Sequence, residues 1–320
     1  MIGAIGDERL IPDGFFAKLP GVERAVPILK PYKLVSREFN PENTVITVKG
    51  VPIGGKAFQV IAGPCSVETQ EQMRASAAAV SSAGALLMRG GAFKPRTSPY
   101  TFQGLGELGL KYLVEAARKY DLPVVTELMD PRDIDTVLEH GVDIIQIGTR
   151  NMQNFRLLKE VGKLNVPVIL KRGMSATIKE WLMAAEYIAA NGNMNIILAE
   201  RGIRTFEDAY RNVLDISAIP FLKRETHLPV IVDPSHAGGQ AWMVPALSRA
   251  AMAAGADGLL VESHPNPAQA WSDGEQALTN DGLKILMDEL EAIGHAIGRP
   301  LGRATKDLPK FLGVGARMAS

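Results

Sequence analysis

One cysteine, one histidine and two carboxylates in this sequence form a set that could hold a metal ion. Cys65, His236, Glu262 and Asp273 offer one sulfur, one nitrogen and two oxygen donors. This mixture of soft, borderline and hard donors suits Mn, Fe, Co or Zn and does not choose among them. Each residue also has a plainer explanation: a lone cysteine is often a small buried hydrophobe, and His264 is a rival for His236, or a phosphate or outer-layer contact. We predict a divalent metal site.

Six basic residues form a second set, and their side chains are suited to anions. Guanidinium forks and ammonium groups match the oxygens of phosphate and carboxylate groups. So many cations indicate more than one anionic group, such as two phosphates and a carboxylate. The alternative is that each is a separate ion-paired surface residue. It is a reasonable explanation for any one of them and a poor explanation for all six. The six are Arg89, Lys94, Arg96, Arg150, Lys171 and Arg201.

Both sets follow short apolar runs that we predict to be strands. The runs are apolar throughout instead of alternating, which is typical of parallel strands buried on both faces. They cover residues 58–63, 85–90, 122–127, 143–148, 166–171, 195–200, 228–233 and 258–262. Between them lie segments with helical periodicity, such as 76–84, 111–120 and 178–192. Several of these helices should end at a left-handed glycine, and the candidates are Gly84, Gly141, Gly162 and Gly255.

Eight strands alternating with eight helical segments predict an α/β fold, a (β/α)8 TIM barrel over residues 57–298. A doubly wound open sheet is the competing arrangement. In such a barrel the chemistry lies at the carboxyl ends of the strands, and all eight predicted ends carry polar residues, including Glu127. Uncompensated charge at a strand end costs desolvation energy. A barrel without a function at that end therefore has no need of polar residues at all eight strand ends. Closure also places the last strand, with Glu262, beside the first, with Cys65.

The segments outside the predicted barrel are short. Residues 44–56 read as a β-hairpin with Lys49 and Gly50 at its turn. Residues 1–43 suggest a strand, a short helix and another strand, which is too little to bury a core of its own. We expect that segment to dock on the barrel or on another subunit. Residues 299–320 are a polar C-terminal extension that should pack on the outside.

Composition excludes several classes of protein. The 320 residues include 35 basic and 35 acidic ones, so the net charge is zero and gives no global attraction to nucleic acid or to an anionic membrane. A single cysteine cannot form an intramolecular disulfide, which favours a reducing cytoplasm. No apolar stretch approaches the ~18 residues of a membrane span, and the N-terminus lacks the pattern of a signal peptide.

One glycine pattern is misleading. Gly104, Gly106 and Gly109 match the G-x-G-x-x-G dinucleotide fingerprint. That fingerprint requires a strand directly before its first glycine, whereas a proline-punctuated loop precedes it here. The nicotinamide oxidoreductase that it would indicate is therefore set aside.

Five blocks, in order, resemble a known family. They are IAGPCS at 61–66, KPRTSP at 94–99, DPSHAGG at 233–239, VESH at 261–264 and WSDG at 271–274. They look like 3-deoxy-D-arabino-heptulosonate 7-phosphate (DAHP) synthase, type I beta branch, over residues 30–298. The resemblance implies a transferase that condenses phosphoenolpyruvate with D-erythrose 4-phosphate on a divalent metal and releases inorganic phosphate. This is the first step of the shikimate pathway to the aromatic amino acids.

The resemblance also implies roles for individual residues. Cys65, His236, Glu262 and Asp273 match the metal ligands, and Arg89, Lys94, Arg150, Lys171 and Arg201 match contacts to phosphoenolpyruvate. Arg96 and Thr97 match contacts to the aldose phosphate, and His264 is a further substrate contact. Lys94 is a candidate proton donor, and Glu127 is an acidic catalytic residue in the same site. The two substrates carry two phosphates and one carboxylate, the anions that the six basic residues indicated. A homotetramer is implied as well.

Two points set the limits of the resemblance. The sibling family, 3-deoxy-D-manno-octulosonate 8-phosphate synthase, has Lys-Ala-Asn-Arg-Ser-Ser where this chain has Lys-Pro-Arg-Thr-Ser-Pro from Lys94 to Pro99, which favours the four-carbon aldose phosphate. A non-catalytic barrel scaffold is the alternative of another class, and it predicts no phosphate release. Gly6 to Arg9 match the middle of a ferredoxin-like regulatory domain, so residues 1–43 should be a partial remnant of it. Whether feedback inhibition by tyrosine or phenylalanine survives is open.

Overall fold

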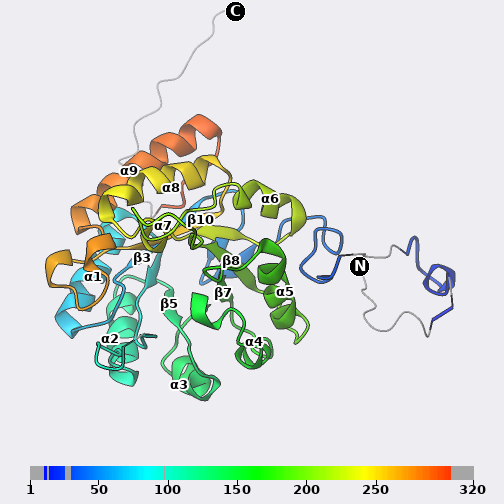
Figure 1. Ribbon diagram of the computed structural model, residues 1–320, viewed down its shortest axis with the longest axis horizontal. Coiled ribbons are helices and arrows are strands. Elements are labelled where there is room, and N and C mark those ends of the chain that lie inside the picture. The colour runs from blue at the N-terminus through cyan, green and yellow to red at the C-terminus, as the bar shows by residue number, and fades with distance from the viewer. Residues whose placement is uncertain (1–10, 13, 26–29, 97, 304–320) are drawn as a thin grey trace, which may run out of the picture.

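Eight parallel strands close into a barrel in the computed structural model, which describes residues 11–12, 14–25, 30–96 and 98–303 (Figure 1). The strands follow one another around the ring in chain order, and β10 closes it against β3. Their bounds are β3 Gln59–Gly63, β4 Leu87–Arg89, β5 Val124–Glu127, β6 Ile144–Ile147, β7 Val168–Lys171, β8 Ile196–Glu200, β9 Val230–Val232 and β10 Gly258–Glu262. Each lies within one of the eight predicted runs. The predicted barrel is confirmed, and the doubly wound open sheet is excluded.

Helices surround the strands on the outside of the ring (Figure 1). They are α1 Gln70–Ala83, α2 Glu107–Arg118, α3 Ile134–Glu139, α4 Phe155–Val161, α5 Ile178–Ala189, α6 Ala218–Glu225, α8 Val244–Ala253 and α9 Asn280–Ile297. The short helix α7, Pro234–Gly238, follows β9 directly and lies at the strand ends. Local chemistry sets their ends. The side chain of Thr177 accepts a hydrogen bond from the Glu180 backbone, and Glu180 reciprocates, so α5 begins at a capping box. Of the misleading glycines, Gly104 and Gly106 lie in the loop before α2, as expected, and Gly109 lies in its first turn.

The glycine stops are confirmed at three positions and wrong at one. Gly84, Gly141 and Gly255 have φ of 86°, 82° and 97°, in the left-handed region. Gly162, at the end of α4, has a φ of −66° and is right-handed. A Cβ there would lie 2.7 Å from Cβ of Asn191, so close packing against the end of α5, instead of a helix-stop conformation, requires the glycine.

The antiparallel hairpin of β1 (Ile46–Val48) and β2 (Val51–Ile53) plugs the end of the barrel where the strands begin. Lys49 and Gly50 both have positive φ, as the predicted tight turn demands. Ile46, Val48 and Ile53 belong to one buried cluster with the side chains that fill the barrel interior, such as Ile61 and Ile169. A larger cluster lies between the strands and the helices. The hairpin is thus part of the core and closes one end of the ring.

The segments beyond the barrel are tied to its outside. Glu186 of α5 accepts hydrogen bonds from the backbone of Leu34 and Val35, and residues 300–302 pair with Phe58, directly before β3. None of the described residues from 11 to 25 is buried. Residues 1–10, 13, 26–29 and 304–320 lie outside the described part, so the ferredoxin-like remnant over 1–43 stays a prediction, as does the end of the C-terminal extension. No helix in the described ranges is long and apolar enough to cross a membrane.

Candidate metal centre and anion-binding mouth

The four predicted metal ligands meet at the end of the barrel where the strands finish. Cys65 follows β3, His236 lies in the short helix α7 after β9, Glu262 ends β10, and Asp273 lies in the loop between β10 and α9. Pairing of Glu262 with Gly63 brings the last strand beside the first. One donor atom from each residue lies within 4.8 Å of all the others. Donors bound to one transition-metal ion at 2.0–2.3 Å are at most about 4.6 Å apart, so the four donors need to draw together by only a few tenths of an ångström to hold one ion.

The thiol of Cys65 lies among charged partners. Its Sγ is 3.0 Å from Oδ2 of Asp273, and Nζ of Lys94 donates to Sγ and to the Cys65 carbonyl oxygen, each at 2.9 Å. Burial and the negative charge of Glu262 raise the pKa of the thiol to about 12. Without a metal, the thiol therefore keeps its proton and donates it to Asp273. A metal ion must displace that proton to bind the thiolate.

His236 is oriented by Asp233, a buried carboxylate at the end of β9. Oδ1 of Asp233 accepts from the His236 backbone N–H at 2.9 Å, and Oδ2 lies 2.8 Å from Nδ1 of the imidazole. This contact leaves Nε2 facing Glu262, whose Oε1 is 3.5 Å away. Oδ2 of Asp233 also accepts from Nζ of Lys171 at 2.5 Å. Although burial opposes it, the charges of His236 and Lys171 hold the pKa of Asp233 well below its usual value.

Glu262 is fixed on both sides. Oε1 accepts from Arg89 at 2.8 Å, and Oε2 accepts from Nε2 of Gln276 at 2.6 Å. Gln276 in turn accepts from Arg211 at 2.6 Å. Burial raises the pKa of Glu262, but the charges of His236 and Arg89 outweigh it and the net shift is downward. The carboxylate is therefore ionised at neutral pH, as a metal ligand must be.

Asp273 has a left-handed backbone, with a φ of 52°. Only three non-glycine residues in the described part of the chain have positive φ, and this is the one at the cluster. Such a conformation is uncommon outside glycine and persists where the surrounding structure imposes it. Burial works against ionisation, but the hydrogen bond from Cys65 and the charge of His236 lower the pKa of Asp273 to about 2. The loop therefore presents a carboxylate to the other three ligands.

Four of the six predicted cations are buried, which excludes the explanation that they are surface ion pairs. Arg89, Lys94, Lys171 and Arg201 are each 4–6% exposed. Nε and one terminal nitrogen of Arg201, and Nε of Arg89, are buried without a hydrogen-bond partner. Burial lowers the pKa of Arg201. A buried donor without an acceptor is costly, so these nitrogens indicate a place for an anion.

Three of the remaining predicted residues, Arg96, Glu127 and Arg150, lie on the strand-end side of the barrel. Arg150 is exposed and donates to the Pro95 carbonyl at 2.7 Å, and Nε of Arg96 donates to the Phe102 carbonyl at 3.0 Å. Glu127 is half-buried at the end of β5 and accepts from Gln146 at 3.4 Å. Thr97 lies outside the described residues.

His264 is buried, and both of its ring nitrogens have protein partners. Nε2 lies 3.3 Å from Oε2 of Glu68, and Nδ1 accepts from the Asn266 backbone at 3.0 Å. Its role as a substrate contact stays a prediction. This geometry fits the alternative of an outer-layer residue better.

Three residues of the centre were missed as site residues in the sequence. Asp233 stands at a strand end, in the same motif as His236, and that position was the available signal. Gln276 and Glu68 carry no comparable signal because their partners are distant in sequence: Gln276 bonds Glu262 and Arg211, and Glu68 bonds Trp271.

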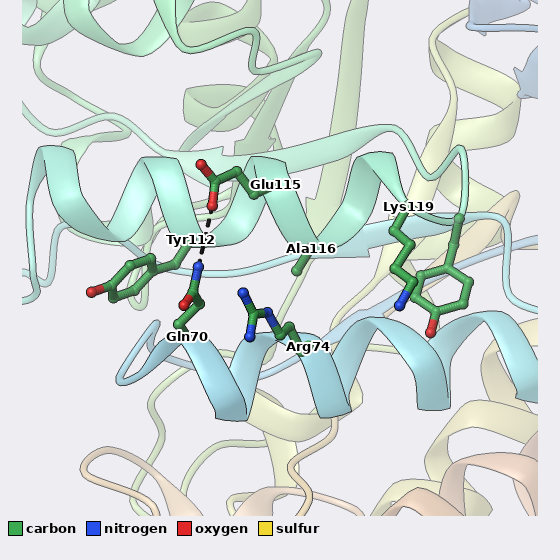
Figure 2. Close-up of a pocket in the computed structure, with 7 residues that line it drawn as sticks. Gln70, Arg74, Tyr112, Glu115, Ala116 and Lys119 are labelled. Atoms are coloured by element: carbon green, nitrogen blue, oxygen red, sulfur yellow. Dashed lines mark hydrogen bonds between the residues drawn. The ribbon is translucent and has the colours of Figure 1, made fainter.

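A separate hollow of about 390 Å³ lies outside the barrel, between α1 and α2 (Figure 2). Gln70 and Arg74 line it from α1, Tyr112 and Glu115 line it from α2, and Lys119 lines it from the end of α2. Nε2 of Gln70 spans the gap to Glu115 at 3.4 Å. None of the predicted site residues lines it. The hollow is therefore distinct from the centre at the strand ends.

Comparison with known proteins agrees with the motifs. The sequence model of the DAHP synthetase I family matches residues 42–296. Phospho-2-dehydro-3-deoxyheptonate aldolase of Thermotoga maritima is 56% identical over 298 residues, which are 93% of this chain and 88% of that protein. A 2-dehydro-3-deoxyphosphooctonate aldolase of Koribacter versatilis is 32% identical over 275 residues, 79% of this chain and 97% of that one.

Solved structures show the same relation. The crystal structure of DAHP synthase from Thermotoga maritima superimposes with a TM-score of 0.84 at 55% identity, covering 93% of this chain and 87% of that one. A truncated form of the Thermotoga maritima enzyme has a TM-score of 0.79 at 52% identity and covers 84% of this chain and 99% of its own. The family match spans the barrel, the hairpin and all four clustered donors. The chain belongs to the DAHP synthetase I family.

Proposed function

We propose that the mouth of this barrel binds phosphoenolpyruvate and D-erythrose 4-phosphate and joins them through its own charged residues. The reaction is that of a DAHP synthase, a transferase: the two substrates condense to DAHP with release of inorganic phosphate, in the first step of the shikimate pathway. The observation that carries the residue assignment is the position of buried cations, two of them with unpartnered nitrogens, beside a cluster of S, N and O donors. That combination suits anionic substrates next to a metal.

The metal ligands in this proposal are Cys65, His236, Glu262 and Asp273. The donor set and its 4.8 Å spread suit a divalent transition metal, and Mn, Fe, Co and Zn all remain candidates. When bound, such an ion supplies Lewis acidity that polarises the aldehyde of erythrose 4-phosphate. Asp233 prepares the site by holding the imidazole of His236 with Nε2 toward Glu262.

Phosphoenolpyruvate is held by the cations at the strand ends. Arg89, Lys94, Lys171 and Arg201 are buried, and Arg150 lies at the rim. We assign the unpartnered nitrogens of Arg201 and Arg89 to the phosphate and the carboxylate, because planar guanidinium groups bind both in a bidentate way. Lys94 and Lys171 contribute ammonium groups, and Arg150 contributes from the rim. Arg96 and Thr97, which follow Lys94, are assigned to the phosphate of the aldose. Positioning of both substrates beside these charged groups supplies much of the rate enhancement.

The bond changes place two residues in proton transfer. C3 of phosphoenolpyruvate attacks C1 of the aldehyde, and the aldehyde oxygen takes a proton, for which Lys94 is the donor next to the metal cluster. Water adds to C2. Cleavage of the bond between C2 and the phosphate ester oxygen then releases inorganic phosphate and leaves the ketone. Glu127, half-buried and held by one long hydrogen bond from Gln146, is assigned to accept a proton of that water.

A phosphate-release assay tests the proposal. The protein is incubated with phosphoenolpyruvate and either erythrose 4-phosphate or arabinose 5-phosphate, with and without a chelator. We expect phosphate only with the four-carbon substrate, and its loss on chelation with recovery on adding back a divalent metal. Release with arabinose 5-phosphate alone would favour the octulosonate synthase, and no release with either would favour the scaffold.

A homotetramer belongs to the same proposal and is supported by the resemblance; the mass from sedimentation equilibrium tests it. A cytoplasmic location is supported by the single cysteine, which serves here as a thiolate ligand and needs a reducing environment.

A further inference from the structure

Glu68 is a buried carboxylate outside the predicted site that contacts three different segments. It lies in the loop between β3 and α1 and is 6% exposed. Oε1 accepts from the hydroxyl of Ser66 at 3.0 Å and from the backbone N–H of Trp271 at 2.8 Å. Oε2 lies 3.3 Å from Nε2 of His264. A carboxylate this buried is rare unless its oxygens are satisfied, and here both are.

Each of these contacts lies one or two residues from a metal ligand. Ser66 follows Cys65, His264 is two residues after Glu262, and Trp271 is two residues before Asp273. The Cys65 and Glu262 segments are already aligned by the pairing of β3 with β10, which ends at Gly63 and Glu262. Beyond that point the loop that carries Asp273 has no strand to hold it.

The loop of Asp273 needs such an anchor. Its base is closed where the backbone of His264 donates to Leu278 and that of Leu278 donates to Glu262, each at 2.9 Å. Between these points the chain turns through the left-handed conformation of Asp273. The bond from Trp271 to Glu68 crosses 203 residues of sequence and ties this part of the loop to the segment that follows Cys65.

The chemistry of the contacts requires a carboxylate. Nδ1 of His264 accepts from the Asn266 backbone, so the ring carries its proton on Nε2 and donates it to Glu68. Ser66 and Trp271 are donors as well. An amide at position 68 that kept its oxygen toward Ser66 and Trp271 would turn its NH2 group against the N–H of His264. A glutamine at position 68 therefore has nearly the same size as glutamate but places a donor where an acceptor is needed.

We infer that Glu68 is a positioning residue that holds the segments of Cys65, Glu262 and Asp273 at the spacing needed to bind one metal ion. The inference rests on the proposed ligand set. It gives the outer-layer His264 a function as well, because His264 links Glu68 to the segment after Glu262. Outer contacts of this kind commonly change metal affinity by 10–100-fold.

The experiment compares Co²⁺ binding by the wild-type chain and the variants Glu68→Gln, Glu71→Gln and Cys65→Ala. Glu71 is an exposed carboxylate three residues away in α1, so its variant removes the same charge without the contacts. Affinity is measured by competition with a chromophoric chelator, and the thiolate-to-cobalt charge-transfer band reports the ligand geometry. We expect Glu68→Gln to bind Co²⁺ about 10–100-fold more weakly with an altered band. Glu71→Gln should stay within twofold of wild type.

The outcomes separate this inference from the ligand assignment. If Cys65→Ala keeps the affinity and the band, the proposed ligand set is wrong, whatever Glu68→Gln does. If Cys65→Ala loses them and Glu68→Gln matches wild type, only the role of Glu68 is wrong. Should Glu68→Gln not fold without metal, Glu68→Asp replaces it, because it keeps the charge on a side chain shorter by one methylene and should also bind more weakly. Failure of both to fold would make Glu68 a support of the barrel and overturn the inference.

Discussion

The two ends of the barrel are built from the same eight strands and have opposite chemistry. At the end where the strands begin, an apolar hairpin fills the opening, and Ile53 is fully buried against the barrel interior. At the end where they finish, charged side chains such as Arg89, Lys171 and Glu262 are almost as buried. The plugged end contributes stability through apolar burial. The mouth buries charges at a cost in desolvation energy, as expected where a barrel carries its functional site.

The comparison shows how buried charge is tolerated. At the mouth, each carboxylate of the cluster has a donor: Glu262 has Arg89 and Gln276, and Asp233 has Lys171 and His236. The guanidinium groups are less completely paired, because Arg201 has two buried nitrogens without a partner and Arg89 has one. Substitutions at the mouth should therefore change metal binding and turnover while leaving folding nearly intact. Those at the plugged end should do the reverse.

The largest effect should come from Cys65→Ala at the mouth. Loss of the sulfur ligand should lower turnover at least about 10³-fold, or about 4 kcal/mol in the activation barrier. The unfolding free energy of the metal-free protein should change by only about 1 kcal/mol. Phosphate release and urea unfolding measure the two quantities. Full activity of a metal-free Cys65→Ala sample would remove the metal from the mechanism.

At the plugged end, Ile53→Ala should destabilise the fold by about 2–5 kcal/mol because it leaves a cavity in the barrel core. Turnover per folded molecule should be unchanged. Val45→Ala is the matched control, since Val45 precedes the same hairpin and is 49% exposed. Urea unfolding gives the stability of each. If Ile53→Ala lowered turnover under conditions in which the variant is fully folded, the two ends of the barrel would be coupled.

Asp233→Asn should have an intermediate effect at the mouth. The variant weakens the hold on His236 and on Lys171, and metal affinity should fall about 10–100-fold. Chelator competition measures it, with Asp135→Asn, an exposed acid of α3, as the control. An unchanged affinity would mean that packing alone orients His236.

The smallest effect should be a pH dependence at the plugged end. His227 is buried before β9; Nδ1 lies 2.6 Å from Oγ1 of Thr44, and Nε2 lies 2.8 Å from the Leu34 carbonyl oxygen. Burial lowers the pKa of His227 below 6.5. As the pH falls below about 6.5, His227 therefore stays neutral in the folded protein but takes up a proton in the unfolded chain. Stability is therefore complete above about pH 6.5 and falls as the pH drops toward the folded pKa, by at most about 1.4 kcal/mol per pH unit.

His227→Gln isolates this contribution because glutamine can offer one donor and one acceptor without titrating. Urea unfolding of both proteins between about pH 5 and 8 should show the wild type losing more stability below pH 6.5. Parallel profiles would show that His227 titrates alike in the folded and unfolded states.

Much of the fold was predictable because the signals were local. Each strand is a continuous apolar run, and Lys49-Gly50 marks a turn that only residues tolerating positive φ can make. Gly162 was misread because a helix-stop glycine and a packing glycine look alike in sequence. What decides between them is a neighbour, Asn191, 29 positions later.

The sequence by itself determined the barrel, the polar strand ends and the identity of the candidate ligands, because these depend on residue type and on periodicity along the chain. Tertiary structure decided which side chains meet. It buried two nitrogens of Arg201 without hydrogen-bond partners, turned both ring nitrogens of His264 toward the protein, and joined Glu68 to a loop more than 200 residues away. Such contacts form in the loops beyond the strand ends, between residues far apart in sequence, and no local pattern encodes them.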